Sequence, residues 1–139
     1  MSTLLSRSNA WMESAKNAMS RIRENDAFMD CACFNIQQAI EFLLKYELDT
    51  IKVKYGETHN IMELVRLFKN SKYDLSTIEN LFMMADTITE WEFNIRNGKD
   101  IIVTRRRIVM ACTIYYDLLD LFQGRTKNDD NNDNPDNPY

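Results

Sequence analysis

The chain has 139 residues, with 17 lysines and arginines against 21 aspartates and glutamates, and a net charge of −4. Four of the acids and both prolines lie in residues 128–139, so residues 1–127 are electrically neutral and contain no proline. The neutral composition of residues 1–127 excludes a general polyanion binder, because strong non-specific binding needs a large excess of bases. The low glycine and proline content excludes a turn-rich all-β domain, which needs more than three glycines.

The first part of the chain lacks the apolar run typical of a signal peptide, and no segment reaches the roughly 20 apolar residues of a membrane span. We therefore expect a cytoplasmic protein with no membrane partner. The three cysteines form no CxxC pair and are expected to be small buried or half-buried thiols. Because His59 is the only histidine, we expect no metal site and no cofactor.

Five segments show the 3.6-residue apolar period of amphipathic helices. The first two cover about residues 4–23 and 27–54, with an N-cap signal at residues 25–26 and a stop signal at Gly56. The second segment carries one long apolar stripe. Glu41 and Lys45 fall on its outer face, four residues apart and in the favourable order for an ion pair.

The third expected helix covers residues 61–70 and opens with a capping box of Asn60 and Glu63. The fourth begins with a second capping box, Ser76 and Glu79, and runs to about residue 91. The fifth covers about residues 100–123, and Gly124 is placed to end it.

Short connections between long helices make antiparallel neighbours. We predict an all-α fold, an up-and-down four-helix bundle with one additional short helix, over residues 1–124. Residues 125–139 are expected to form a disordered acidic tail, because Asn, Asp and Pro bury too little apolar surface to offset the loss of chain entropy.

Positive charge gathers between the fourth and fifth expected helices. Residues 96–107 hold five bases against Asp100 alone; the bases are Arg96, Lys99, Arg105, Arg106 and Arg107. Arginines at a helix start oppose the helix dipole, so stability alone does not favour them there, whereas their planar forks suit phosphate oxygens. The segment predicts phosphate or RNA contact; the alternative is solvated arginines, or arginines that pair with acids across an interface.

The string FNIQQAIEFLLK at residues 34–45 resembles the signature second helix of the HEPN (higher eukaryotes and prokaryotes nucleotide-binding) family. The matching positions are Gln38, Ala39, Glu41, Leu44 and Lys45. Residues 58–64, which contain His59, resemble the start of the family's third helix, and Arg96 in the string NIRN resembles the family arginine that follows the fourth.

The resemblance implies a helical bundle, often dimeric. Some members are metal-independent ribonucleases with an Arg-x(4–6)-His motif, in which His moves protons and Arg holds the scissile phosphate. Here Arg96 and the Arg-Asn start of toxin-type members are present, but residues 101–103, where the histidine would fall, are Ile, Ile and Val. Other members bind nucleotides or RNA, or accompany a nucleotidyltransferase as its partner chain.

We therefore expect a non-catalytic, homodimeric HEPN-like module, with a nucleotidyltransferase-type protein as a further candidate partner. The residues expected to bind a nucleotide or RNA phosphate are Arg96, Asn97, Lys99, Arg105 and Arg106. Two alternatives stay open: a divergent ribonuclease that uses Arg96 with another polar group such as Asp100 or Tyr116, and a pure protein-interaction scaffold.

Overall fold

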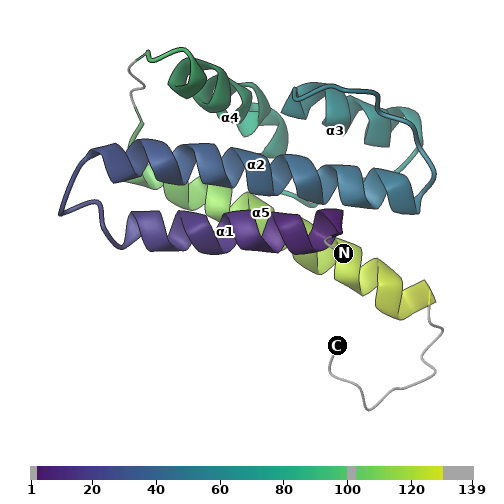
Figure 1. Ribbon diagram of the computed structural model, residues 1–139. Helices are drawn as coiled ribbons and strands as arrows, with labels where there is room; N and C mark the ends of the chain where they lie inside the picture. The colour runs from purple at the N-terminus through teal and green to yellow at the C-terminus, as the bar shows by residue number, and fades with distance from the viewer. Residues whose placement is uncertain (1–2, 100–102, 130–139) are drawn as a thin grey trace.

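The computed structural model describes residues 3–99 and 103–129, with side chains as far as Gly124. It contains five helices in the predicted order (Figure 1): α1 (Leu4–Met19), α2 (Ala27–Thr50), α3 (Ile61–Asn70), α4 (Leu81–Arg96) and α5 (Arg105–Asp129). No strand occurs in these described ranges, so the all-α prediction is confirmed.

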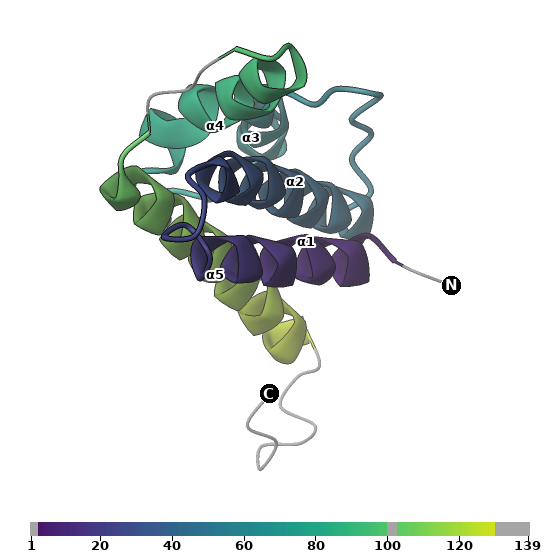
Figure 2. The ribbon, with the colours of Figure 1, turned by 60° about the vertical axis from the view of Figure 1, so that its left-hand side comes forward.

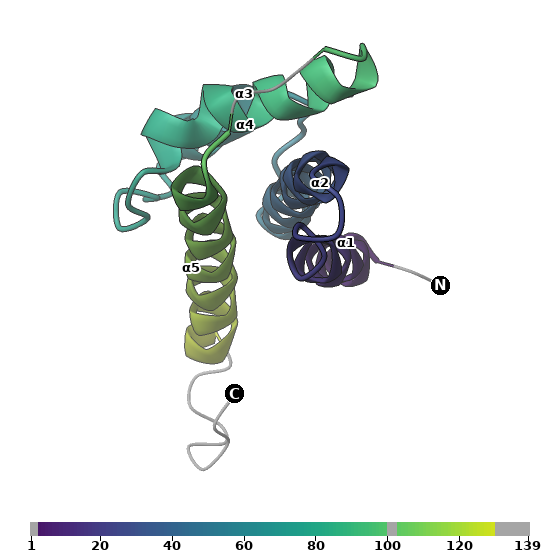
Figure 3. The same ribbon diagram turned by 90° about the vertical axis from the view of Figure 1, so that its left-hand side faces the viewer.

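Helix α2 is the centre of the fold and contacts each of the other four helices. Helix α1 runs antiparallel beside α2, and α5 crosses this pair obliquely (Figures 1 and 2). Viewed along α1 and α2, helix α4 lies across one side of the pair and α5 lies beside another (Figure 3), whereas α3 runs along α2 (Figure 1). A helix covered on several sides must be apolar over most of its surface. The buried apolar residues of α2 are Ala32, Cys33, Ile36, Ala39, Ile40, Leu43, Leu44 and Leu48.

Two groups of side chains fix the outer helices. The hydroxyl of buried Ser8 on α1 donates to the carbonyl of Ala39 on α2 (2.6 Å), and the Tyr115 hydroxyl on α5 donates to Asn9 Oδ1 on α1 (2.7 Å). At the other side of the core, Phe68 of α3 stacks on Phe122 of α5 with ring centroids 6.0 Å apart. These contacts tie α1, α3 and α5 into one core around α2.

Local hydrogen bonds move several predicted helix ends. Helix α1 stops at Met19 rather than at residue 23. Asp26 makes no capping hydrogen bond; instead Asn25 Oδ1 accepts from the backbone N–H of Ala27 (2.9 Å). Asn60 caps α3 as predicted, accepting from the N–H of Glu63 (3.1 Å), but the Glu63 side chain accepts from the Thr58 hydroxyl instead of closing the box.

The predicted ends of the last two helices are also partly wrong. The N–H of Ser76 donates to Asp74 Oδ1 (2.8 Å) in a separate turn, and α4 begins only at Leu81, after Asn80 in the left-handed region. Helix α4 then continues past residue 91 to Arg96. Helix α5 starts at Arg105 and passes through Gly124, which does not adopt the positive φ that a helix stop requires, to Asp129. The rest of the expected tail, residues 130–139, lies outside the described residues.

The cysteines occupy three different environments. Cys33 is buried and Cys112 half-buried, as expected, whereas Cys31 is exposed. Burial raises the pKa of the Cys33 thiol to about 12, so this thiol stays protonated and unreactive at neutral pH. Among the described residues, no helix is both long and apolar enough to cross a membrane.

Two helices end with a lysine where glycine is usual. Lys52 follows α2 with φ 61°, and the N–H of Val53 donates to the carbonyl of Leu48 (2.9 Å). Lys72 follows α3 with the same φ and the equivalent bond, from Tyr73 to Phe68 (2.9 Å). This is the Schellman pattern, in which a side chain at the left-handed position is strained. Lys52, rather than Gly56, therefore ends α2.

We expect Lys52→Gly to raise the free energy of unfolding by roughly 0.5–1 kcal/mol, because relief of the left-handed strain exceeds the added entropy of the unfolded chain. Urea denaturation measures the change. Lys16→Gly, inside α1, is the control and should lose about 1 kcal/mol. A loss of stability in both variants would contradict the strain at Lys52.

Candidate functional site

The turn after α4 depends on the backbone conformation of Gly98. The N–H of Gly98 donates to the carbonyl of Ile95 (3.1 Å), and the N–H of Lys99 donates to the carbonyl of Asn94 (2.8 Å). Gly98 has φ +68°, which a side chain would strain. This turn brings Lys99 back over the last turn of α4 and begins the segment 96–107, which we call the Arg96 loop.

Arg96 is exposed but anchored. Its Nη2 pairs with the carboxylate of Glu92, one turn earlier on α4. The Glu92 side chain is only 10% exposed, whereas that of Arg96 is 62% exposed. The carboxylate therefore holds one side of the guanidinium from within the protein, and the remaining N–H donors face solvent.

The neighbours of Arg96 have different roles. Lys99 Nζ lies over the exposed ring of Phe93, 5.6 Å from its centroid. The side-chain amide of Asn97 donates to the Phe93 carbonyl (2.7 Å) and so serves the end of the helix. Lys99 is thus positioned beside Arg96, while one of the two N–H donors of the Asn97 amide is already used.

Arg105 and Arg106 occupy the exposed start of α5. The Thr104 hydroxyl caps this start by accepting from the N–H of Arg107 (3.2 Å). Neither Arg105 nor Arg106 forms an ion pair within the described part of the chain. Residues 100–102, which include Asp100, lie outside the described residues, and Val103 is half-buried.

A buried ionic cluster forms where α2 meets the start of α3. Glu41 is 1% exposed, and both of its carboxylate oxygens are used. Oε1 accepts from Gln37 Nε2 (2.9 Å), and Oε2 accepts from Lys45 Nζ (2.9 Å) and lies 3.0 Å from His59 Nδ1. We call these four residues the Glu41 cluster.

The prediction that Glu41 and Lys45 lie on an outer face of α2 is wrong. Both are buried, because the segment that leads into α3 covers this side of α2. His59 closes that segment onto α2 through Glu41, as a loop histidine would. Of the family-motif residues, Glu41, Lys45 and His59 are thus brought together, while half-buried Gln38 stays apart and Gln37 takes the contact instead.

The Glu41 cluster and the Arg96 loop are linked through α4. The N–H of Ile61 donates to Thr89 Oγ1 (2.9 Å), so the start of α3 is fixed to α4 seven residues before Arg96. Seven helical residues correspond to roughly 10 Å along the axis. The start of α3, two residues after His59, is therefore fixed about two turns of α4 away from Arg96, while His59 itself contacts Glu41.

The sequence did not identify two residues that hold these side chains in place, Gln37 and Glu92. Each stands four residues before its partner, Glu41 or Arg96, and this i,i+4 spacing is the signal that could have identified them. The structure also separates Tyr116 from the Arg96 loop, because Tyr116 lies nine residues after Arg107 on α5, roughly 14 Å along the helix. In the described part of the chain, no three His, Cys, Asp or Glu side chains gather as a metal ion would require.

The family model of the HEPN domain matches residues 1–108. The chain belongs to the HEPN domain family. The HEPN match covers α1 to α4, the Glu41 cluster, Arg96 and the first turn of α5. No curated protein and no solved structure matches the chain.

We expect Glu41→Gln to lower the free energy of unfolding of this HEPN domain by about 3 kcal/mol, because it leaves the Lys45 ammonium buried without its counter-ion. Urea denaturation measures the loss. In the double variant Glu41→Leu with Lys45→Met, which removes both charges, most of the stability should return.

Glu13→Gln provides the matched control, since the Glu13–Lys16 pair has the same two residue types on an exposed helix face. Its loss should stay below about 0.5 kcal/mol. Equal losses at Glu13 and Glu41 would contradict the role assigned to the buried pair.

Proposed function

We propose that this HEPN domain is a non-catalytic module that binds the phosphate of a nucleotide or of RNA at the Arg96 loop. The observation that carries the proposal is the exposed Arg96 guanidinium, held in place by the nearly buried carboxylate of Glu92. A cation fixed before the ligand arrives loses less conformational entropy on binding, and a planar guanidinium can contact two phosphate oxygens at once. Lys99, Arg105 and Arg106 supply further positive charge along the same loop.

We propose a non-catalytic module because of the position of the histidine. Cleavage of RNA without a metal requires a group that transfers protons next to the phosphate. His59, the one imidazole, contacts Glu41 on α2, and the start of α3 that follows it is bonded to α4 about two turns before Arg96. Tyr116, a substitute in the alternative ribonuclease hypothesis, lies well along α5.

We further propose a homodimer in which the Arg96 loops of two copies face one shared cleft. Phe93 in the last turn of α4 and Val109 early in α5 flank the loop along the chain. Phe93 is 56% exposed and Val109 is 50% exposed. These exposed apolar side chains are the ones that we propose the second copy covers. A nucleotidyltransferase-type protein is the other occupant proposed for this surface.

Titration with nucleoside phosphates and short RNA tests the phosphate site. We expect Arg96→Ala to weaken binding at least tenfold, because a charge-assisted hydrogen bond contributes about 1.5–3 kcal/mol. Glu92→Gln should weaken it less, because the guanidinium remains but loses its anchor. Arg23→Ala, an exposed cation beyond α1, is the control.

Equal affinity of wild type and Arg96→Ala would contradict the phosphate role and favour a protein-interaction scaffold. Incubation of the wild type with RNA in the presence of a chelator tests the ribonuclease alternative. We expect intact RNA; cleavage that disappears in Arg96→Ala would replace the non-catalytic proposal.

A further inference from the structure

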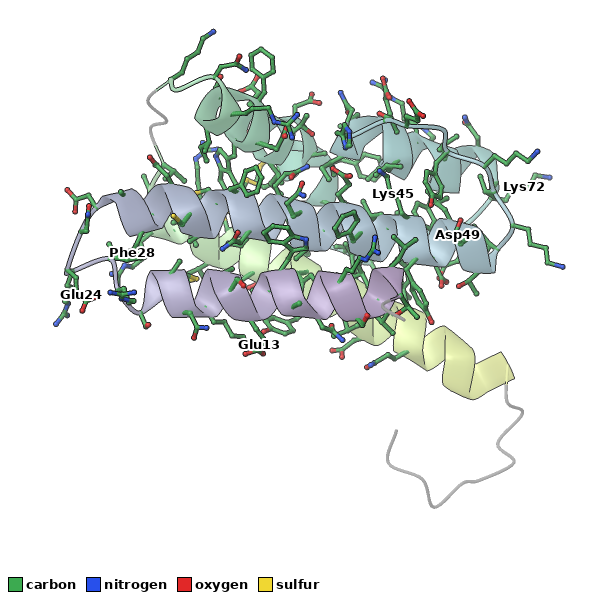
Figure 4. All side chains as sticks on the ribbon, viewed as in Figure 1. Glu13, Glu24, Phe28, Lys45, Asp49 and Lys72 are labelled. Carbon is green, nitrogen blue, oxygen red and sulfur yellow. The ribbon has the colours of Figure 1, made fainter. Side chains whose placement is uncertain are left out.

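A second positively charged surface lies at the opposite end of the molecule from the Arg96 loop. Figure 4 places Lys72 and Asp49 at the end where α2 and α3 finish, whereas Phe28 and Glu24 mark the other end, above which α4 finishes. Residues 52–72 contain five bases and two acids. The bases are Lys52, Lys54, Arg66, Lys69 and Lys72, and all five are exposed.

These five cations differ from Arg96, which is paired with Glu92. None of them forms an ion pair, a side-chain hydrogen bond or a ring contact with any residue that the structure describes. Three of the neighbouring acids are hydrogen-bonded to groups other than these cations: Asp49 accepts from the Tyr55 hydroxyl (3.3 Å), Glu63 from the Thr58 hydroxyl, and Asp74 from the N–H of Ser76 (2.8 Å). Within the described part of the chain, none of these five cations is therefore paired with an acid.

Three of the cations form a row. Arg66 and Lys69 are one turn apart on α3, so their side chains are neighbours, and Lys72 follows in the turn that ends the helix. A row of separate charges suits a ligand whose negative charges repeat along its length.

A pocket lies on each flank of α3, and each pocket contains two of the cations and at least one aromatic ring. The first has a volume of about 340 Å³ and is lined by Lys69, Lys72, Tyr73, Phe82, Val65 and Leu75, with Asp74 and Ser76 at the same turn. The second has a volume of about 300 Å³ and is lined by Lys54, Arg66, Tyr55, Leu67, Thr58 and Glu63. Both volumes are at the small end of the range for ligand pockets, large enough for one flat ring with its substituents.

The rings of these pockets are held in place. The Tyr73 hydroxyl donates to Glu47 Oε2 (2.6 Å), and its ring packs edge-on against Phe68 with centroids 5.1 Å apart. Lys45 Nζ, part of the Glu41 cluster, lies 5.5 Å from the centroid of the Tyr55 ring. Phe82, at the start of α4, leaves 47% of its surface exposed. The rings of Tyr73 and Tyr55 are thus held by contacts within the protein, and the ring of Phe82 is exposed to a ligand.

We propose that this surface, the α3 row with its two flanking pockets, binds a single strand of nucleic acid. The strand's phosphates lie along Arg66, Lys69 and Lys72, and its bases enter the pockets against Phe82 and Tyr55. Proteins that hold single strands combine these same two elements, a track of positive charge and rings on which bases stack. An acidic peptide would match the charge but would not require two pockets walled by rings. The surface is separate from the Arg96 loop and does not depend on it.

Fluorescence anisotropy with a labelled oligouridylate of about ten nucleotides, at several salt concentrations, tests the inference. We expect the triple variant Arg66→Gln, Lys69→Gln, Lys72→Gln to bind at least tenfold more weakly. The slope of log affinity against log salt should become shallower by about 2, since each phosphate contact on a single strand contributes about 0.7. Phe82→Ala should weaken binding about tenfold without changing the slope.

The matched control is a triple variant of exposed cations at the other end, Lys16→Gln, Arg21→Gln and Arg23→Gln, which should retain the wild-type affinity and slope. Circular dichroism confirms that each variant is folded. Wild-type affinity in the α3 triple variant, or no binding by the wild type, would overturn the inference. Full competition by polyglutamate together with an unchanged Phe82→Ala would also overturn it, in favour of an acidic protein.

Arg96→Ala in the same assay separates the two surfaces. If Arg96→Ala removes binding and the α3 triple variant does not, the strand is bound at the Arg96 loop and the inference on α3 fails. If the α3 triple variant removes binding while Arg96→Ala affects neither the strand nor nucleotides, the inference holds and the proposed phosphate site fails.

Discussion

The buried Glu41 carboxylate is the constraint on which the arrangement of α2, α3 and α4 depends. A carboxylate at 1% exposure is tolerated only when its oxygens are paired, and here Gln37, Lys45 and His59 supply the partners. His59 belongs to the segment that leads into α3, so the charge on α2 determines where α3 begins. The start of α3 is bonded in turn to α4, whose last residue is Arg96.

The two basic surfaces differ in how the protein treats their charges. Arg96 has an internal counter-ion, Glu92, which orients it and reduces its net charge, so its contribution to binding is mainly directional. The cations along α3 have no counter-ion among the described residues, so their contribution is mainly electrostatic and sensitive to salt. Both surfaces lie within a body whose charges sum to zero, and the overall composition therefore conceals them.

The sequence predicts the five helices and their order, because apolar periodicity reflects the burial that also determines the fold. It predicts helix ends less well, because these depend on single hydrogen bonds: Ser76 bonds to Asp74 rather than starting α4, and Gly124 keeps a helical φ. The apolar periodicity of residues 27–54 also places Glu41 and Lys45 on the solvent side, because it cannot show that a loop from elsewhere in the chain covers that side of α2. Family motifs identified Glu41, Lys45, His59 and Arg96, but the contacts of Gln37 and Glu92 emerged only from the packing.

Hydrogen exchange of the backbone amides in Glu41→Gln tests most directly whether this carboxylate holds α3 in place. We expect amides in residues 61–70 to lose protection by a larger factor than those of α1, because α3 loses its anchor while the α1–α2 pair retains its apolar contacts. Equal loss of protection across all five helices, or unchanged protection in α3, would contradict the central role of Glu41.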